Sequence, residues 1–171
     1  GATAASGTGP PLRYARLMRP LSLGEARIDT VLELEAVPMP FAQFLPASSP
    51  EAIAAERSWL LPQHADATLA CGLLSFHTYV IRHRGRTILV DTCMGNDKDR
   101  GGHPLFHGLR THWLDELAAL GVRPESVDYV MCTHLHIDHS GWNTVLRDGR
   151  WVPTFPRAKY VFHKREYAAW E

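Results

Sequence analysis

Apolar and polar residues alternate along several short segments of the chain, which is the pattern of strands that bury one face. The first segment is expected to bury one face until Pro38 interrupts the pattern. The residues of that face are Ile28, Val31 and the alternating Leu32, Leu34 and Ala36. A tight turn at 84–85 is expected to join the next two strands. The strands predicted in this way are 26–37, 76–83, 86–91, 127–132 and 159–162.

Other segments carry apolar residues at helical spacing. A helix is predicted over 109–120, and Gly121 follows it as a stop signal. A shorter helix over 50–60 would be capped by Ser48 or Ser49, and a further helix is expected to begin at residue 164. Strands interspersed with helices in this order predict an α/β protein.

Composition narrows the class of protein a little further. The 171 residues include 18 basic and 18 acidic side chains, so no net field attracts nucleic acid or an anionic membrane. The arginines are scattered and form no basic tract, and no segment is long and apolar enough to cross a bilayer. Three cysteines without a Cys-x-x-Cys pair argue against a disulfide framework. We therefore expect no nucleic-acid or membrane partner.

The start of the chain differs in composition from the rest. Residues 1–11 are small, polar and rich in Gly and Pro, without an initiator Met or a hydrophobic signal core. The chain is therefore expected to divide into a flexible lead-in, 1–25, and a domain, 26–171. A cytoplasmic location is favoured, and secretion after removal of a signal peptide is the alternative.

The segment 133–141 concentrates side chains that bind metals. Its donors are His134, His136, Asp138 and His139. Imidazole and carboxylate groups at this density suit a borderline divalent cation such as zinc. In an extended segment the first three would project to one side, with Leu135 and Ile137 toward the interior, and a helix starting at His139 would let Asp138 and His139 reach a second metal. The strand 127–132 comes directly before, so the donors are expected at a strand end, the usual place for a site in an α/β protein.

This segment resembles the metallo-β-lactamase superfamily of metallo-hydrolases. The resemblance includes Ile88-Leu89-Val90-Asp91-Thr92 upstream and the segments 141–144 and 155–160 downstream, and it extends from about Arg27 to the end of the chain. It is strongest to the branch around N-acyl homoserine lactonases and methyl parathion hydrolase. The family implies an αβ/βα sandwich that carries one or two divalent metal ions, usually zinc, with iron, manganese or cobalt as alternatives. It also implies a metal-bound hydroxide as the nucleophile.

The resemblance assigns roles to individual residues by position. His134 and His136 would bind the first metal, and Asp138 and His139 would bind the second. Asp138 and Asp91 are the carboxylates expected to serve catalysis. Asp138 would act as a ligand, and Asp91 would orient a ligand through a hydrogen bond, as metal-bound imidazoles generally require.

The chain departs from the family pattern downstream of the motif. The family completes its site with a further His, a bridging Asp and a last His, whereas this chain continues for only about thirty residues, and its His163 follows too soon to match. The sequence thus supplies the first half of the sandwich and a little more, which would leave an apolar sheet face uncovered. We expect a fragment of a longer polypeptide. A homodimer and a rearranged fold are the alternatives.

Other residues near the motif allow two interpretations each. The loop 92–108 holds His103 and His107, which are either ligands or, as we favour, members of a substrate-side or surface loop. Cys93 could approach the metal, but a small buried apolar residue is the favoured interpretation.

The resemblance predicts a metal-dependent hydrolase of lactone, ester or phosphotriester bonds, and with it a small-molecule substrate. Gly-x-Ser-x-Gly and P-loop patterns are absent from the sequence, which argues against serine hydrolase or nucleotidase chemistry. Two alternatives remain. One is an iron-dependent persulfide dioxygenase that shares the motif, and the other is an inactive chain that acts as a binding or assembly module.

Overall fold

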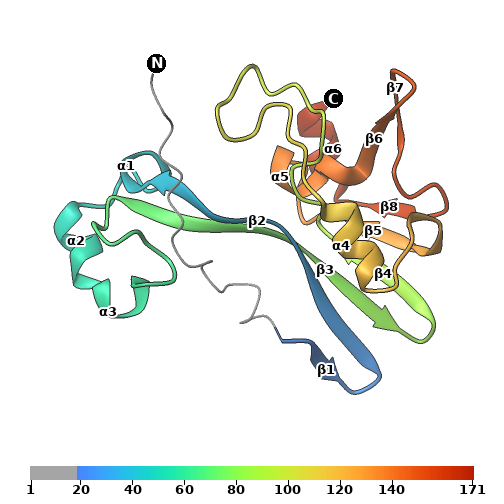
Figure 1. The fold of residues 1–171 in the computed structure, drawn as a ribbon, viewed down its shortest axis with the longest axis horizontal. Coiled ribbons are helices and arrows are strands. Elements are labelled where there is room, and N and C mark those ends of the chain that lie inside the picture. The colour runs from blue at the N-terminus through green and yellow to red at the C-terminus, as the bar shows by residue number, and fades with distance from the viewer. Residues whose placement is uncertain (1–18) are drawn as a thin grey trace, which may run out of the picture.

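The computed structural model of the protein describes residues 19–171, which form a six-stranded sheet, a separate two-stranded hairpin and several short helices (Figure 1). The strands are β1 (Leu21–Leu23), β2 (Ala26–Pro40), β3 (Cys71–His83), β4 (Arg86–Val90), β5 (Tyr129–Met131), β6 (Thr144–Arg147), β7 (Arg150–Pro153) and β8 (Lys159–Val161). The helices are α1 (Phe41–Phe44), α2 (Pro50–Ala55), α3 (Arg57–Leu60), α4 (Trp113–Ala119), α5 (Ile137–Ser140) and α6 (Lys164–Trp170), with 3-10 turns η2 (Pro124–Ser126) and η3 (Gly141–Asn143). In the part of the chain described, no helix has the length and apolarity needed to span a membrane.

The order of the strands decides where the functional residues meet. The six-stranded sheet runs β1-β2-β3-β4-β5-β8, antiparallel as far as β4 and parallel from β4 to β8. In the parallel part Val90 is paired with Met131, and Met131 is paired with Val161. The carboxyl ends of these three strands therefore lie at one edge of the sheet, the edge at which α/β proteins bind ligands.

Most strands lie where the alternating pattern places them. The turn at 84–85 is present, and both residues have the positive φ angles of a two-residue hairpin turn, 47° and 72°. Strand β2 extends past Pro38 to Pro40, beyond the predicted end. Among residues 19–171, β1 pairs with residues 26–28, and no strand pairs with the same edge of β2 further along, which is where a sheet tolerates proline.

Of the three predicted helices, the one from residue 164 begins where expected, and the other two differ from the pattern. Helix α4 begins at Trp113, four residues later than predicted. The residues before it are held outside the helix, since the Asn96 side chain accepts a hydrogen bond from the backbone N–H of Thr111 at 2.8 Å. The helix predicted over 50–60 is divided at Glu56 into α2 and α3, and Ser49 is its N-cap, with the side chain accepting from Ala52 N at 3.2 Å.

The segment assigned to a flexible lead-in is described from residue 19 onward. Residues 21–23 form β1, a short strand that the alternating pattern did not predict. The lead-in prediction for residues 1–18 lies outside the described residues.

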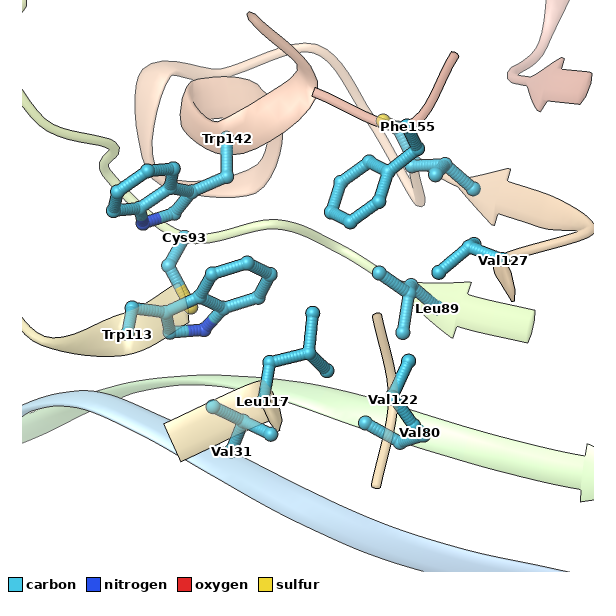
Figure 2. Packing of buried hydrophobic residues seen from close by; sticks show 12 residues of the cluster. Val31, Val80, Leu89, Cys93, Trp113, Leu117, Val122, Val127, Trp142 and Phe155 are labelled. Atoms are coloured by element: carbon cyan, nitrogen blue, oxygen red, sulfur yellow. The ribbon is translucent and has the colours of Figure 1, made fainter. Parts of the chain in front are cut away.

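One face of the sheet is covered by the main hydrophobic core. Leu117 of α4 packs with Val31 and Val80 from the sheet, and all three are almost fully buried (Figure 2). Trp113 stacks on Trp142 with 5.3 Å between ring centroids, and the two rings are nearly parallel at 16°. Helix α4 therefore packs against both the sheet and η3, the 3-10 turn that follows α5.

The inward face predicted for β2 is confirmed at Val31 but wrong at Ile28 and Leu32, which lie on the other side of the sheet. Asp29 and Val31 are each 2% exposed and point into the core, and Glu33 follows them on that face, whereas Leu32 lies opposite. Register shifts after Leu32 disturb the alternation. The side facing the core was misassigned because two buried acids, Asp29 and Glu33, made the true inward face look polar.

The opposite face of the sheet carries exposed apolar residues. An open hollow of about 560 Å³ on this face is lined by Leu21, Ile28, Tyr79, Ile81 and Val90, among others. Met131 and Val161 are each 45% exposed. Among residues 19–171, this face of the sheet therefore carries accessible apolar side chains.

Candidate metal centre

Asp91 connects the end of β4 to the histidine-rich segment. Its carboxylate accepts hydrogen bonds from the backbone N–H of Thr133 at 2.8 Å and from the Thr133 hydroxyl at 2.9 Å. It also lies 2.9 Å from Nδ1 of His139. The residue adopts a left-handed conformation with φ 56°. This conformation is uncommon for residues other than glycine, although Asp and Asn adopt it more often than most. Asp91 is thus held so that both carboxylate oxygens face the segment after β5.

The histidine-rich segment turns into a helix earlier than predicted. Helix α5 begins at Ile137, with His136 as its N-cap, so Asp138 lies inside the helix and not in an extended segment. Leu135 packs against the core as expected, but Ile137 is 40% exposed. The expectation that Ile137 points inward is wrong, because the side-chain period changes from 2 to 3.6 where the helix begins.

The four predicted ligands lie together at the strand edge. The ring centroid of His134 is 3.9 Å from that of His139 and 4.6 Å from that of His136. Nε2 of His139 lies 3.2 Å from a carboxylate oxygen of Asp138. All four positions come from one short segment that follows β5.

The chemistry of these donors fits a divalent metal such as zinc. Two ligands of one tetrahedral zinc ion, each about 2.0–2.1 Å from it, lie about 3.3 Å apart, close to the separation of His139 Nε2 and the Asp138 oxygen. Within residues 19–171, however, no three His, Cys, Asp or Glu side chains stand where they could jointly hold an ion. The fit therefore rests on the donor types and on the spacing of the Asp138–His139 pair.

The backbone after Asp91 runs alongside the backbone of α5 and η3. Thr92 N donates to His139 O at 2.9 Å, and Trp142 N donates to Thr92 O at 2.8 Å. Gly141 N donates to Cys93 O, also at 2.8 Å. These bonds join the segment that contains Asp91 to the segment that contains Asp138 and His139.

Cys93 is a buried residue of the core. It is 1% exposed, and its Sγ lies 3.4 Å from the Thr78 hydroxyl. Burial raises the pKa of the Cys93 thiol, which keeps it protonated at neutral pH. Its surroundings agree with the favoured interpretation of a small buried apolar residue.

The three histidines considered as further ligands, His103, His107 and His163, have partners of their own. His103 stacks on Phe106 with ring centroids 4.7 Å apart, and His107 Nδ1 accepts from the backbone N–H groups of Arg100 and Gly102 at 3.1 Å. His163 is the N-cap of α6, with its Nδ1 accepting from Arg165 N at 3.2 Å. These contacts suit a surface loop and a helix cap.

Three residues near the motif were not singled out from the sequence. Glu166 of α6 accepts from Leu135 N at 3.1 Å, and Arg100 approaches Ile137 O at 3.5 Å. Glu33 accepts from Trp142 Nε1 at 2.6 Å. Each of these contacts joins residues more than thirty positions apart, so no local sequence pattern predicts it.

Comparison with known proteins places these features in a family. A profile of the metallo-beta-lactamase superfamily matches residues 72–171. The N-acyl homoserine lactonase AttM of Azorhizobium caulinodans is 36% identical over 52 residues, which are 30% of this chain and 16% of that protein.

Solved structures match over a longer part of the chain. A probable metal-dependent hydrolase from Staphylococcus aureus superposes with a TM-score of 0.61 at 21% identity, covering 86% of this chain and 50% of its own. AidC, a dizinc quorum-quenching lactonase in complex with a product, gives 0.61 at 20% identity, covering 89% and 46%. The hydrolase AbOPH gives 0.54 at 21% identity, covering 88% and 46%.

These matches confirm the predicted fold. The chain spans about half the length of the solved structures it resembles, and a smaller share of AttM. The profile covers more than half of the chain, including β3 to β5, the histidine-rich segment and α6. The chain therefore belongs to the metallo-beta-lactamase superfamily and has its mixed α/β fold over about half the length of these structures.

Proposed function

We propose that the protein is a metal-dependent hydrolase of lactone, ester or phosphotriester bonds, with His134, His136, Asp138 and His139 as its metal ligands. The observation that carries the proposal is the contact of Asp91 with Thr133 and His139, which joins the end of β4 to the ligand segment. The lactonase relative AttM and the lactonase AidC support a small ester-like substrate. Zinc is the favoured metal.

The contacts of His139 suggest how the chain prepares this residue as a ligand. Asp91 lies 2.9 Å from Nδ1 of His139, and a carboxylate at this position favours the tautomer that carries its proton on Nδ1 and leaves the Nε2 lone pair for a metal. Nε2 is the atom that lies beside the Asp138 carboxylate, 3.2 Å away. The pair therefore presents one nitrogen and one oxygen donor on the same side.

A bound zinc ion supplies a Lewis acid and a coordinated water with a pKa near 7, which is what hydrolysis at neutral pH requires. Asp138 and His139 are partly accessible, with side chains 33% and 26% exposed, so a small substrate can approach the pair. Arg100 lies near Asp138 and contributes a positive charge beside the ligand segment.

The proposal is tested by metal-dependent hydrolysis. Chelation is expected to abolish turnover of an acyl homoserine lactone, an aryl ester or a phosphotriester, and zinc is expected to restore it. His136→Ala is expected to lower the rate by more than about 100-fold, because losing a hydrogen-bonded partner of a ligand already costs about 10–100-fold. His112→Ala is the matched control, since its side chain is 88% exposed and contacts Asp115.

Different results would point elsewhere. Unchanged hydrolysis by His136→Ala would contradict the proposed ligand set. Iron content with oxygen uptake in place of hydrolysis would favour the persulfide dioxygenase. Metal binding without turnover of any substrate would favour a binding or assembly module.

A further inference from the structure

Glu33 of β2 lies on the core-facing side of the sheet and accepts four hydrogen bonds. Its carboxylate accepts from Met94 N at 2.6 Å and Gly95 N at 3.3 Å. It also accepts from the Thr111 hydroxyl at 3.0 Å and from Trp142 Nε1 at 2.6 Å. Burial raises the pKa of Glu33, and these hydrogen bonds oppose that effect by favouring the ionised form.

Two of these donors belong to the loop directly after Asp91. Along this loop Asp91, Cys93 and Gly95 have φ angles of 56°, 49° and 76°. Left-handed residues at alternate positions direct consecutive backbone N–H groups toward one point, which is the geometry of an anion-binding nest. The Glu33 carboxylate occupies the nest formed around Met94 and Gly95. It therefore stabilises a left-handed backbone conformation that residues other than glycine rarely adopt.

The third donor belongs to the segment directly after the predicted ligands. Trp142 follows Gly141, and its indole stacks on Trp113 beside Cys93 (Figure 2). A Cβ placed on Gly141 would lie 2.0 Å from the carbonyl group of Met94, so the two backbones are in direct contact. Glu33 thus binds both segments at the place where they touch.

We propose that Glu33 is a positioning residue of the metal centre, whose carboxylate sets the separation of Asp91 from Asp138 and His139 by binding the segment that follows each. This inference rests on the proposed function, because it assigns the alignment a role in metal binding. Glu33 acts through Met94, Gly95 and Trp142, and its hydrogen bonds are to these residues and Thr111.

The test compares zinc affinity and the cobalt spectrum of folded variants. Glu33→Gln keeps the side-chain size but places an amide N–H₂ against N–H donors, so we expect about 10-fold weaker zinc binding in a chelator competition. We also expect a changed visible absorption of the cobalt(II)-loaded chain, measured well below the unfolding temperature. Glu35→Gln is the matched control, because Glu35 lies on the same strand and one of its carboxylate oxygens has no hydrogen-bond partner.

A second variant keeps the proposal testable if Glu33→Gln does not fold. Trp142→Phe removes the indole N–H and retains an aromatic ring for stacking on Trp113, so a smaller loss of zinc affinity is expected. In the double variant, Glu33→Gln should then lower the zinc affinity by less than it does in the wild-type background. This coupling distinguishes positioning from a general loss of stability, which would lower the unfolding temperature and leave the metal spectrum unchanged.

The possible results separate this inference from the function on which it rests. Wild-type zinc affinity and an unchanged cobalt spectrum in Glu33→Gln, or in Trp142→Phe if the former does not fold, would overturn the role of Glu33 alone. A wild-type chain that binds neither zinc nor cobalt would overturn the proposed function, and this inference with it.

Discussion

Asp91→Asn is expected to weaken zinc binding by about 10–100-fold while the chain remains folded. Asn tolerates the left-handed conformation that Asp91 adopts at φ 56°, so the substitution does not add backbone strain. Its carbonyl oxygen can still accept from Thr133 N. Its amide nitrogen would replace the carboxylate oxygen that lies 2.9 Å from Nδ1 of His139, and an amide nitrogen cannot act as an acceptor there, so the preference for a proton on Nδ1 is lost.

Zinc affinity of this variant is measured by competition with a chromophoric chelator, and folding by thermal unfolding. Asp115→Asn is the control, because the Asp115 side chain is 81% exposed and pairs with His112. A variant that binds zinc as tightly as the wild type would show that Asp91 does not orient a ligand. The contact with Thr133 would then be structural.

Gly141→Ala is expected to destabilise the chain by at least about 3 kcal/mol and to abolish tight zinc binding. The added Cβ would lie 2.0 Å from the carbonyl carbon and oxygen of Met94 and 2.5 Å from Cys93 O. These are backbone atoms that cannot rotate away, so the loop after Asp91 must move from α5. That movement would separate Asp91 from His139.

Gly102→Ala is the matched control for this variant. Gly102 lies in the same loop with φ 74°, and a Cβ there would meet nothing within 4 Å. It should cost about 1–2 kcal/mol, the strain of a left-handed alanine, and leave zinc affinity unchanged. Urea unfolding measures the loss of stability in both variants. An equal loss in the two would contradict the close contact at Gly141.

Local patterns were sufficient to predict much of the fold. The 84–85 turn and the strands around it follow from alternation and turn chemistry, which act over a few residues. Strand β1 was not predicted, because its three residues gain their conformation from pairing with β2. The start of α4 at Trp113 also depends on a contact outside the helix, from Asn96 to Thr111.

The candidate site shows the same division between local and long-range information. The four proposed ligands occupy one segment, and Asp91 ends a recognisable strand, so their residue types were apparent from the sequence. The early start of α5 at Ile137 was not apparent, because polar and apolar residues continue to alternate as far as Asp138, inside the helix. Glu33 was missed since its partners lie 61 to 109 positions away and a buried acid on a strand resembles an outward-facing one.

Every proposed role in the site depends on the binding of one divalent metal ion by His134, His136, Asp138 and His139. The most direct measurement is an anomalous difference map at the zinc absorption edge from crystals of the zinc-treated chain. We predict a zinc peak about 2.0–2.2 Å from donor atoms of these residues, including Asp138 and His139. A map without a peak in this segment, or with zinc bound instead at His103 and His107, would contradict the account.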